Sequence, residues 1–306
     1  MTDVPILAAD SLHEHAEVPV SVVIPILNGS QWLPEQLTAL LNDSAQPFQT
    51  VIADNGSMDD SLAVAKAFSA LMPMLIVDAS ASRGQAFARN KGAEAADGEH
   101  LIFLDQDDVV APGYVAAMSG ALQRSEVVAA RMEGLTLNEG WRRHARDLPQ
   151  TEGLPTDPIP WAYGCTLGVR RSTFQRLGGF GQVHSLVAGE DIEFCWRAKE
   201  LGVELAFVRD ALVHYRFPST FRQLFRQGRR YGYAGVVVAS LHGVAPPNPT
   251  TLARSFLGPA RLLVRGPTTG DRAGALFLLG RRIGSATAAR RLSPRRRTHP
   301  FTAVSR

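Results

Sequence analysis

The apolar positions of the first hundred residues fall into short β-branched runs separated by longer helical patterns. Continuous apolar runs, the pattern of strands buried on both faces, occur at 20–26, 50–53, 74–77 and 101–104. Patterns with helical periodicity lie between them. Strands that alternate with helices predict a mostly parallel sheet with right-handed crossovers and helices on both faces. We therefore expect an α/β fold that begins at residue 20.

After residue 108 the alternation becomes less regular. A loop rich in proline and glycine spans 138–160, and loops of that length inside compact domains are usually functional or mobile. Around it the pattern predicts strands at 127–130, 163–169, 205–208 and 211–215, and helices at 113–123, at 171–177 and from 189 onwards. We divide this region into a nucleotide-binding half, 20–108, and a catalytic and acceptor half, 109–217.

The last third of the chain is basic and is predicted to be helical, with helices at 220–241, 252–264 and 272–290. Residues 1–221 carry a net charge of −12, whereas residues 222–306 carry +15, with sixteen arginines, no lysine and one acid. A basic helical extension over 218–306 could lie on an anionic membrane surface, bind nucleic acid, or simply be the solvated face of helices packed on an acidic domain. No apolar stretch approaches the roughly 20 residues of a membrane span.

Composition is that of an ordinary globular protein, with 306 residues, 45% hydrophobic and 20% charged. Two cysteines, Cys165 and Cys195, are too few for a disulfide scaffold and are not spaced as metal ligands, so we expect a reducing, cytoplasmic compartment. Residues 1–19 lack the basic start and apolar core of a signal peptide, and we interpret them as a flexible leader.

The most informative stretch is the apolar run 101–104, which ends in the carboxylates Asp105, Asp107 and Asp108. Open α/β sheets bind ligands at the carboxyl ends of their strands. Clustered carboxylates repel one another, and a divalent cation that bridges them to a phosphate would stabilise the cluster. The alternative is an ordinary solvated loop after a strand.

Glycine-rich phosphate loops are absent from the sequence. No G-x-G-x-x-G follows the first strand, and no G-x-x-x-x-G-K-[ST] occurs anywhere. This argues against a dinucleotide-dependent enzyme and against a P-loop ATPase. A phosphate would instead have to be held through a metal ion.

Five stretches together resemble the family 2 glycosyltransferases, an inverting class with the GT-A fold that uses nucleotide-diphosphate sugars. They are 22–28, 54–59, Arg83-Gly84 with 88–90, 105–108, and 189–191 with Trp196-Arg197, and they extend over roughly residues 20–217. The resemblance implies a GT-A α/β fold, a nucleotide-diphosphate sugar donor, and Mg²⁺ or Mn²⁺.

The resemblance also implies which residues hold the nucleotide. Pro25 and Asn28 match the segment that lines the base and ribose pocket, and Asp54 and Asn55 match the acidic pair that contacts the base. Asn55 stands where the family more often has Asp, so the identity of the base stays open; an ordinary turn and helix cap is the alternative for this pair. Arg83 matches a contact to the diphosphate.

For the metal, the resemblance makes Asp107 the direct ligand, Asp105 a ribose or metal-water contact, and Asp108 an alternative ligand. His214 is a candidate third contact to the metal or diphosphate, although a lone histidine on a short strand is more often structural. Arg89 is a weaker candidate for the diphosphate, because an arginine in a helix is more often a surface ion-pair partner.

Asp191 matches the catalytic base, which takes the proton of the acceptor hydroxyl during a single inverting displacement. Glu190, placed beside it in the substrate site, would raise the pKa of Asp191, and so would partial desolvation. Acids in the first turn of a helix are also explained by the helix dipole alone. The stretch 227–231 lacks the Gln-x-x-Arg-Trp of processive synthases, so transfer of a single sugar is favoured.

Two alternatives remain. A sugar nucleotidyltransferase would carry a glycine-rich basic loop after the first strand, and residues 27–30 do not form one. A non-catalytic scaffold that binds sugar nucleotide or membrane would have no need of Asp105, Asp107 and Asp191 together. The expected acceptor is a saccharide or a lipid-linked molecule of the cell envelope, reached from the inner face of the plasma membrane; we expect no nucleic-acid partner.

Overall fold

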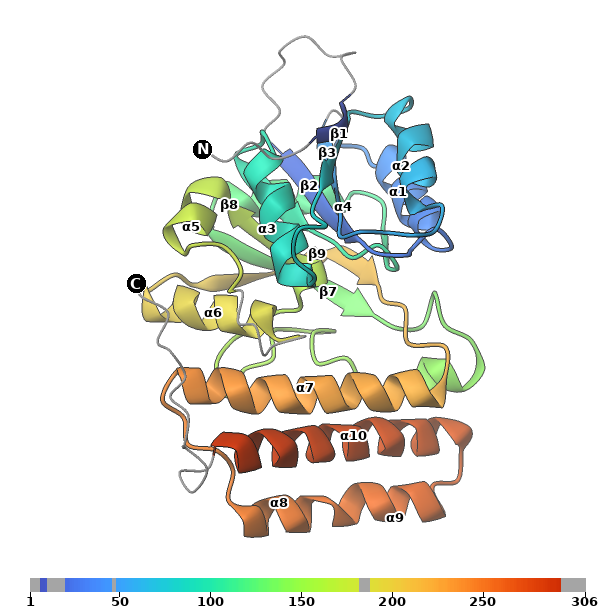
Figure 1. Cartoon of the computed structure of the whole chain (residues 1–306), viewed down its shortest axis with the longest axis vertical. Coiled ribbons are helices and arrows are strands. Elements are labelled where there is room, and N and C mark those ends of the chain that lie inside the picture. Colours follow the sequence, from blue (N-terminus) through green and yellow to red (C-terminus); the bar gives the residue numbers. More distant parts are fainter. Residues whose placement is uncertain (1–5, 10–19, 46–47, 182–187, 293–306) are drawn as a thin grey trace. The chain divides into compact units, whose positions relative to one another are not determined.

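The computed structural model describes residues 6–9, 20–45, 48–181 and 188–292, and the chain divides into two units (Figure 1). The first unit comprises Met1–Glu139, Leu148–Ser185 and Glu190–Arg216. The second comprises Gly140–Asp147, Leu186–Gly189 and Phe217–Arg306. The first is an α/β unit and the second a helical unit.

Within the described residues, the α/β unit is built on one mixed sheet with the strand order β1-β4-β3-β2-β5-β8-β7-β9-β6. The strands are β1 Ile6–Ala9, β2 Val20–Ile26, β3 Gln49–Asp54, β4 Met74–Asp78, β5 His100–Phe103, β6 Val109–Val110, β7 Val127–Glu133, β8 Leu167–Arg170 and β9 Leu205–His214. The helices are α1 Leu33–Leu41, α2 Ser61–Ser69, α3 Gln85–Ala95, α4 Tyr114–Leu122, α5 Arg171–Arg176 and α6 Glu190–Glu200.

The central strands β4, β3, β2 and β5 are parallel, as the alternating pattern predicts. The order reverses between β2 and β5, so the chain moves outward from β2 in both directions, which is the topological switch point where open α/β sheets bind ligands. Strand β8 is antiparallel to both β5 and β7, and the short strand β6 is antiparallel to β9. The sheet therefore has a parallel part, β4-β3-β2-β5, followed by a mixed part, β8-β7-β9-β6.

Four local predictions differ from the structure. The helix expected at 252–264 is two helices, Pro249–Ser255 and Leu257–Arg265. The strand expected at 163–169 begins only at Leu167, because 164–166 forms a 3₁₀ turn, η2. The two strands expected at 205–208 and 211–215 are one strand, β9, whose pairing with β7 shifts register between Ala130 and Arg131. Of the predicted leader, Ile6–Ala9 forms β1 against β4, while the rest of 1–19 lies outside the described residues.

Pro25 lies inside the buried strand β2, where a proline removes a ladder hydrogen bond. The backbone N–H of Leu104 donates to the carbonyl of Val23, so the backbone polar groups of Val23 face β5. The backbone nitrogen of Pro25, two positions later, faces the same side. Paired positions of β2 and β5 end at Val23 and Phe103. The missing N–H of Pro25 therefore lies beyond the last paired position, and the strand accommodates it.

Helix α3 approaches the sheet closely. A Cβ on Gly92 would lie 2.5 Å from Cγ1 of Val23, and the neighbouring residues Ala88 and Ala93 are small and buried. Small side chains at this interface let the helix backbone lie directly on β2. This close approach brings Arg89, on the same helix, into the interior.

The helical unit consists of η1 Gly140–His144, α7 Phe221–Leu241, α8 Pro249–Ser255, α9 Leu257–Arg265 and α10 Thr269–Leu292. Helices α7 and α10 run in the same direction and pack against each other (Figure 1). Helices α8 and α9 carry the chain back from the end of α7 to the start of α10. Cβ atoms on Gly228 or Gly232 of α7 would collide with the backbone of α10, and those on Gly280 or Gly284 would collide with α7. Glycines four apart share one helix face, so the two backbones pack without intervening side chains. None of the described helices is both long and apolar enough to cross a membrane.

Candidate active site

The loops after β2 and β5 are joined by one side chain at the switch point. The amide of Gln106 accepts from the N–H of Leu27 at 2.8 Å and donates to the carbonyl of Leu27 at 3.1 Å. A side chain at Gly29 would collide with this amide. The segment predicted to bind the nucleotide and the segment predicted to bind the metal are thus held together.

The predicted nucleotide residues lie at the carboxyl ends of β2 and β3. Asn28 has a positive φ of 50°, and its Oδ1 accepts from the N–H of Met58 at 2.8 Å. Asp54 is buried and accepts from the N–H of Ser57 at 2.9 Å. The Asn28–Met58 bond connects the two loops, the Asp54–Ser57 bond lies within the loop after β3, and Pro25 lies buried in the strand β2. Contact with a base or ribose remains a prediction for all three residues.

Asn55 organises the loop before α3. Its Nδ2 donates to the carbonyls of Ala79, at 2.5 Å, and Ser82, at 2.7 Å, and its Oδ1 accepts from the N–H of Gly84 at 2.8 Å. An aspartate has no hydrogens to donate, so it could not make the first two bonds. This explains the asparagine at this position. The loop carries Arg83, whose side chain is exposed.

Arg89 differs most from expectation, because it is not a surface residue. Only 2% of Arg89 is exposed; Nη2 donates to Oδ1 of Asp105 and Nη1 to Oε1 of Glu190, both at 2.6 Å. Burial alone would lower the pKa of Arg89, but Asp105 and Glu190 raise it above its usual value. A Cβ on Gly164 would lie 2.6 Å from Nη1, so a larger residue there would displace the guanidinium from its two carboxylates. Arg89 is therefore a buried cation between two predicted site residues.

The carboxylates after β5 are crowded. Asp108 is 1% exposed, and its Oδ1 accepts from the N–H of Arg216 at 2.9 Å. Its Oδ2 is buried and makes no hydrogen bond of ordinary geometry within the described ranges, while the thiol of Cys165 interacts with the same carboxylate. Burial, and next the charges of Asp107 and Asp105, raise the pKa of Asp108 well above its usual value. Burial and Asp105 raise the pKa of Asp107 to about 6. A buried carboxylate oxygen without an ordinary hydrogen bond, among like charges, is the arrangement that a divalent cation would stabilise.

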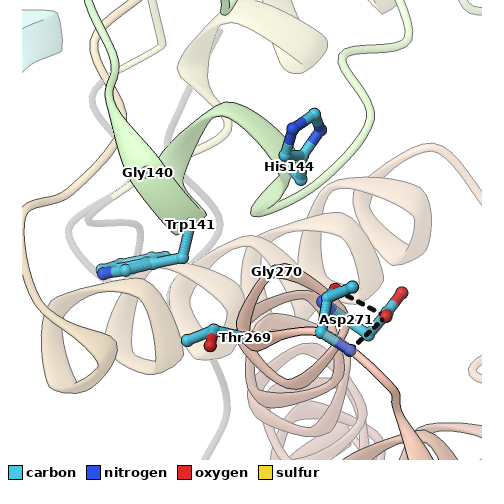
Figure 2. A pocket seen from close by; sticks show the side chains of 7 residues that line it. Gly140, Trp141, His144, Thr269, Gly270 and Asp271 are labelled. Atoms are coloured by element: carbon cyan, nitrogen blue, oxygen red, sulfur yellow. Dashed lines mark hydrogen bonds between the residues drawn. The ribbon is translucent and has the colours of Figure 1, made fainter.

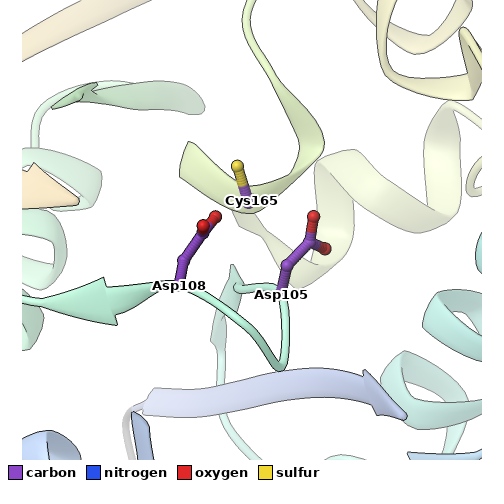
Figure 3. A group of neighbouring side chains, drawn as sticks. All are labelled: Asp105, Asp108 and Cys165. Carbon is purple, nitrogen blue, oxygen red and sulfur yellow. The ribbon is translucent and has the colours of Figure 1, made fainter. Parts of the chain in front are cut away.

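Figure 3 shows a third group beside two of these carboxylates. One oxygen each of Asp105 and Asp108 and the Sγ of Cys165 lie within 4.8 Å of one another. Burial and the charge of Asp108 raise the pKa of the Cys165 thiol well above its usual value, and a thiol is a soft ligand that Mg²⁺ and Mn²⁺ do not favour. The oxygen donors suit Mg²⁺ or Mn²⁺. No pattern in the sequence indicated that Cys165 would lie here.

His214, at the end of β9, is held by a carboxylate. Its Nδ1 lies 2.5 Å from Oε1 of Glu133, and His214 pairs in register with Val109, the residue after Asp108. Metal-binding histidines commonly use one ring nitrogen for such a carboxylate and the other for the metal. The arrangement leaves Nε2 for a ligand, although it also suits a structural pair. Metal binding by His214 remains a prediction.

Asp191 lies in the first turn of α6. Its Oδ2 accepts from the N–H of Gly164 at 3.0 Å and its Oδ1 from the N–H of Ile192 at 2.8 Å. Burial, and next the charge of Glu190, raise the pKa of Asp191 to about 7, while Arg89 and the two backbone bonds oppose the shift. A carboxylate with a pKa near neutrality is a far stronger base than an ordinary aspartate.

Taken together, the structure connects the loop after β5 to the first turn of α6 through one buried arginine. Asp105 and Glu190 share Arg89. The N–H of Gly164 donates to Asp191, and a Cβ added to Gly164 would meet the Arg89 guanidinium. Asn28, Asp54 and Asn55 form a separate set of contacts on the loops after β2 and β3.

Comparison with known proteins gives the family. Residues 21–178 match Glycosyl transferase family 2, and residues 100–281 match Glycosyl transferase family group 2. The chain belongs to glycosyl transferase family 2. It is 26% identical over 238 residues to the pre-mycofactocin glycosyltransferase of Mycobacterium tuberculosis, covering 73% of this chain and 48% of that protein. It is also 26% identical over 238 residues to the glycosyltransferase AglE of Haloferax volcanii, covering 74% of this chain and 76% of that protein. The chain thus spans about half the length of the mycobacterial relative.

Solved structures confirm the GT-A fold that the resemblance implied. The mannosyltransferase PcManGT from Pyrobaculum calidifontis, in complex with GDP-Man and Mn²⁺, superposes with a TM-score of 0.60 at 16% identity, over 92% of this chain and 89% of that one. S. aureus TarS 1–349 in complex with UDP-GlcNAc superposes with a TM-score of 0.57 at 17% identity, over 88% of this chain and 81% of that one. At these identities the likeness concerns the fold.

Proposed function

We propose that this family 2 member is an enzyme that transfers a single sugar from a nucleotide-diphosphate sugar to an acceptor hydroxyl, with inversion. The observation that carries the proposal is Asp191. Its carboxylate is fixed by two backbone N–H groups, and its pKa is raised to about 7. Through Gly164 and Arg89 it is connected to the carboxylate loop predicted to hold the leaving group.

Asp191 acts as the general base. It accepts the proton of the acceptor hydroxyl as that oxygen attacks the anomeric carbon from the face opposite the nucleotide. One displacement of this kind inverts the anomeric centre. The N–H groups of Gly164 and Ile192 hold the carboxylate in place, and Glu190 beside it keeps its proton affinity high.

The donor occupies the carboxyl ends of β2, β3 and β5. Asn28 and Asp54 contact the ribose and base beside Pro25, and the loop shaped by Asn55 presents the exposed Arg83 to the diphosphate. Complexes of similar folds with GDP-Man and with UDP-GlcNAc support a nucleotide-diphosphate sugar of either base.

The residues present fit a divalent cation. Asp107 and Asp105 would hold Mg²⁺ or Mn²⁺, the buried Oδ2 of Asp108 would provide a further oxygen, and Nε2 of His214 is the candidate nitrogen ligand. When bound, such a cation stabilises the charge that develops on the departing nucleoside diphosphate. Cys165 stays protonated beside the site and is not a ligand in this proposal.

The test is hydrolysis of a panel of sugar nucleotides by the full-length protein, with Mn²⁺, with Mg²⁺ and with chelator. We expect slow release of nucleoside diphosphate from one donor, abolished by chelator and restored by excess metal, because water replaces the acceptor in many transferases. If a donor binds tightly but is not turned over with any acceptor, that result would favour a non-catalytic scaffold instead. Release of pyrophosphate from a nucleoside triphosphate would favour a nucleotidyltransferase.

The proposed acceptor is a saccharide or a lipid-linked molecule of the cell envelope, reached from the cytoplasmic face of the plasma membrane. Support comes from residues 222–306, with their charge of +15. On α9, Leu257 is 71% and Val264 77% exposed, and Arg261 lies between them along the helix. Exposed apolar side chains beside arginines are typical of helices that lie on anionic bilayers.

Flotation of the full-length protein with vesicles tests the membrane contact. We expect binding to vesicles with phosphatidylserine, weaker binding to neutral vesicles, and loss of binding when Leu257 and Val264 are both replaced by aspartate. The control is Leu201→Asp, a leucine of the α/β unit that is 59% exposed. Equal flotation of the double variant and the control would contradict the membrane contact.

A further inference from the structure

The helical unit has a hollow that the proposed chemistry does not use. It measures about 530 Å³ and lies between η1 and the start of α10 (Figure 2). Its lining comprises Gly140, Trp141, His144, Thr268, Thr269, Gly270 and Asp271. This volume falls within the range of small-molecule sites.

Trp141 provides an aromatic wall. Its indole stacks on Phe221, with ring centroids 4.4 Å apart and planes tilted by 32°, so one side of the indole is supported by α7. The side chain is half-buried and lines the hollow. A supported ring loses little conformational freedom when a ligand binds to it.

The opposite wall is the first turn of α10, and its polar groups are held in place. Oδ2 of Asp271 accepts from both the N–H and the hydroxyl of Thr268, at 3.0 and 2.6 Å. These bonds leave Oδ1 of Asp271 as an acceptor. Thr269 adds an exposed hydroxyl, and His144 adds a ring that can donate or accept.

The two walls are held at a fixed spacing by a glycine. A Cβ on Gly270 would lie 2.8 Å from the Cβ of His144, so only a glycine lets η1 lie against the first turn of α10. The hollow is therefore part of the packing of this unit.

Its chemistry discriminates between ligands. The hydrogen bonds from Thr268 lower the pKa of Asp271, so the carboxylate is ionised at neutral pH and opposes a phosphate or another anion. An aromatic face attracts the weakly positive C–H groups on the flat side of a pyranose ring. Carboxylate, hydroxyl and imidazole groups accept and donate to sugar hydroxyls.

We propose that this hollow binds a neutral saccharide, with a sugar ring on Trp141 and its hydroxyls on Asp271, Thr269 and His144. This inference goes beyond the proposed transferase function and does not depend on it.

Saturation-transfer NMR on the full-length protein, without donor or metal, tests the subsite directly. The probes are maltose, cellobiose, lactose and mannobiose, with a digalacturonate as the anionic comparison. We expect at least one neutral disaccharide to bind and the digalacturonate to bind more weakly. No signal from any neutral disaccharide, or stronger binding of the digalacturonate, overturns the proposal.

Variants locate the binding. Trp141→Ala should weaken it about tenfold or more, and Asp271→Asn, which keeps an oxygen to cap Thr268, should weaken it about fivefold. Leu241→Ala, an exposed apolar residue of the same unit outside the hollow, should leave it unchanged. Binding that survives both pocket variants overturns the proposal. Donor hydrolysis measured in parallel separates the two ideas: with hydrolysis intact and no saccharide bound, the subsite fails and the transferase stands.

Discussion

Nη1 of Arg89 donates a 2.6 Å hydrogen bond to Oε1 of Glu190, a residue 101 positions later in the chain. The other terminal nitrogen of the same guanidinium donates to Asp105. One buried cation thus connects the end of β5 to the start of α6. Because the predicted base Asp191 follows Glu190 directly, the position of the base depends on Arg89.

Replacing Arg89 by alanine should destabilise the protein strongly. It would leave the carboxylates of Asp105 and Glu190 without their buried counter-ion, which typically costs about 3–5 kcal/mol of unfolding free energy. The control is Arg176→Ala, which removes the exposed ion pair with Glu126 and should cost less than about 1 kcal/mol. Urea unfolding measures both; similar losses in the two variants would contradict the buried pairing.

Gly164→Ala should disturb the same centre without removing a charge. The new methyl would lie within van der Waals overlap of the Arg89 guanidinium, and overpacking of this kind typically costs about 1–3 kcal/mol. Gly120→Ala on α4 has open space around its Cβ and should be neutral or stabilising by up to about 1 kcal/mol. Thermal unfolding of the two variants side by side checks the difference. An unchanged midpoint for Gly164→Ala would contradict the close packing of Gly164 against the Arg89 guanidinium.

Asp191→Asn should abolish transfer while donor binding persists. The amide cannot accept the acceptor proton as a base, but it keeps the size and one oxygen of the carboxylate. We expect the donor dissociation constant, measured by calorimetry with Mn²⁺, to change by less than about threefold. Near-normal turnover in this variant would exclude Asp191 as the base.

The pH dependence should follow the titration of Asp191. The base works only when ionised, and its pKa is raised to about 7, so kcat/KM should fall about tenfold per pH unit below 7 and reach a plateau above it. Glu190→Gln removes a negative neighbour that raises this pKa, so the midpoint should move to lower pH. A midpoint that stays in place, or moves to higher pH, would contradict the coupling of the two acids.

The metal site should depend on Asp108 and not on Cys165. Asp108→Asn removes a charge whose second oxygen makes no ordinary hydrogen bond among the described residues, and Mn²⁺ affinity measured by EPR should fall about tenfold or more. Cys165→Ala removes a protonated thiol, so Mn²⁺ affinity should stay within about threefold. Loss of Mn²⁺ binding in the cysteine variant would make Cys165 a ligand.

Much of the α/β unit could be predicted from local pattern. The runs at 20–26, 50–53, 74–77 and 101–104 are continuous and apolar because their strands are buried on both faces, and parallel strands must end at one edge. That is why the residues after β2, β3 and β5 could be placed at a common site. The family followed from the spacing of the motifs and is confirmed.

The hydrophobic pattern could not show which side chains that are far apart in the sequence come into contact. From the sequence, Arg89 is expected at the surface. Helical periodicity does not show that helix α3 lies directly on the sheet at Gly92. Cys165 comes to the carboxylates through a 3₁₀ turn inside a predicted strand. Trp141 lies in the long loop, where nothing local indicates a stacking partner such as Phe221.

The sequence by itself determined the parallel direction of the central strands, the carboxylates that end β5, and the family, since each is indicated by short stretches of residues that are neighbours in the chain. Only the tertiary structure decided that Asp105, Glu190 and Gly164 surround one buried arginine, and that burial and the charge of Glu190 raise the pKa of Asp191 to about 7. The physical reason is that burial and charge act through space. Desolvation and Coulomb interactions depend on which segments lie together, whereas hydrophobic periodicity depends only on neighbours along the chain.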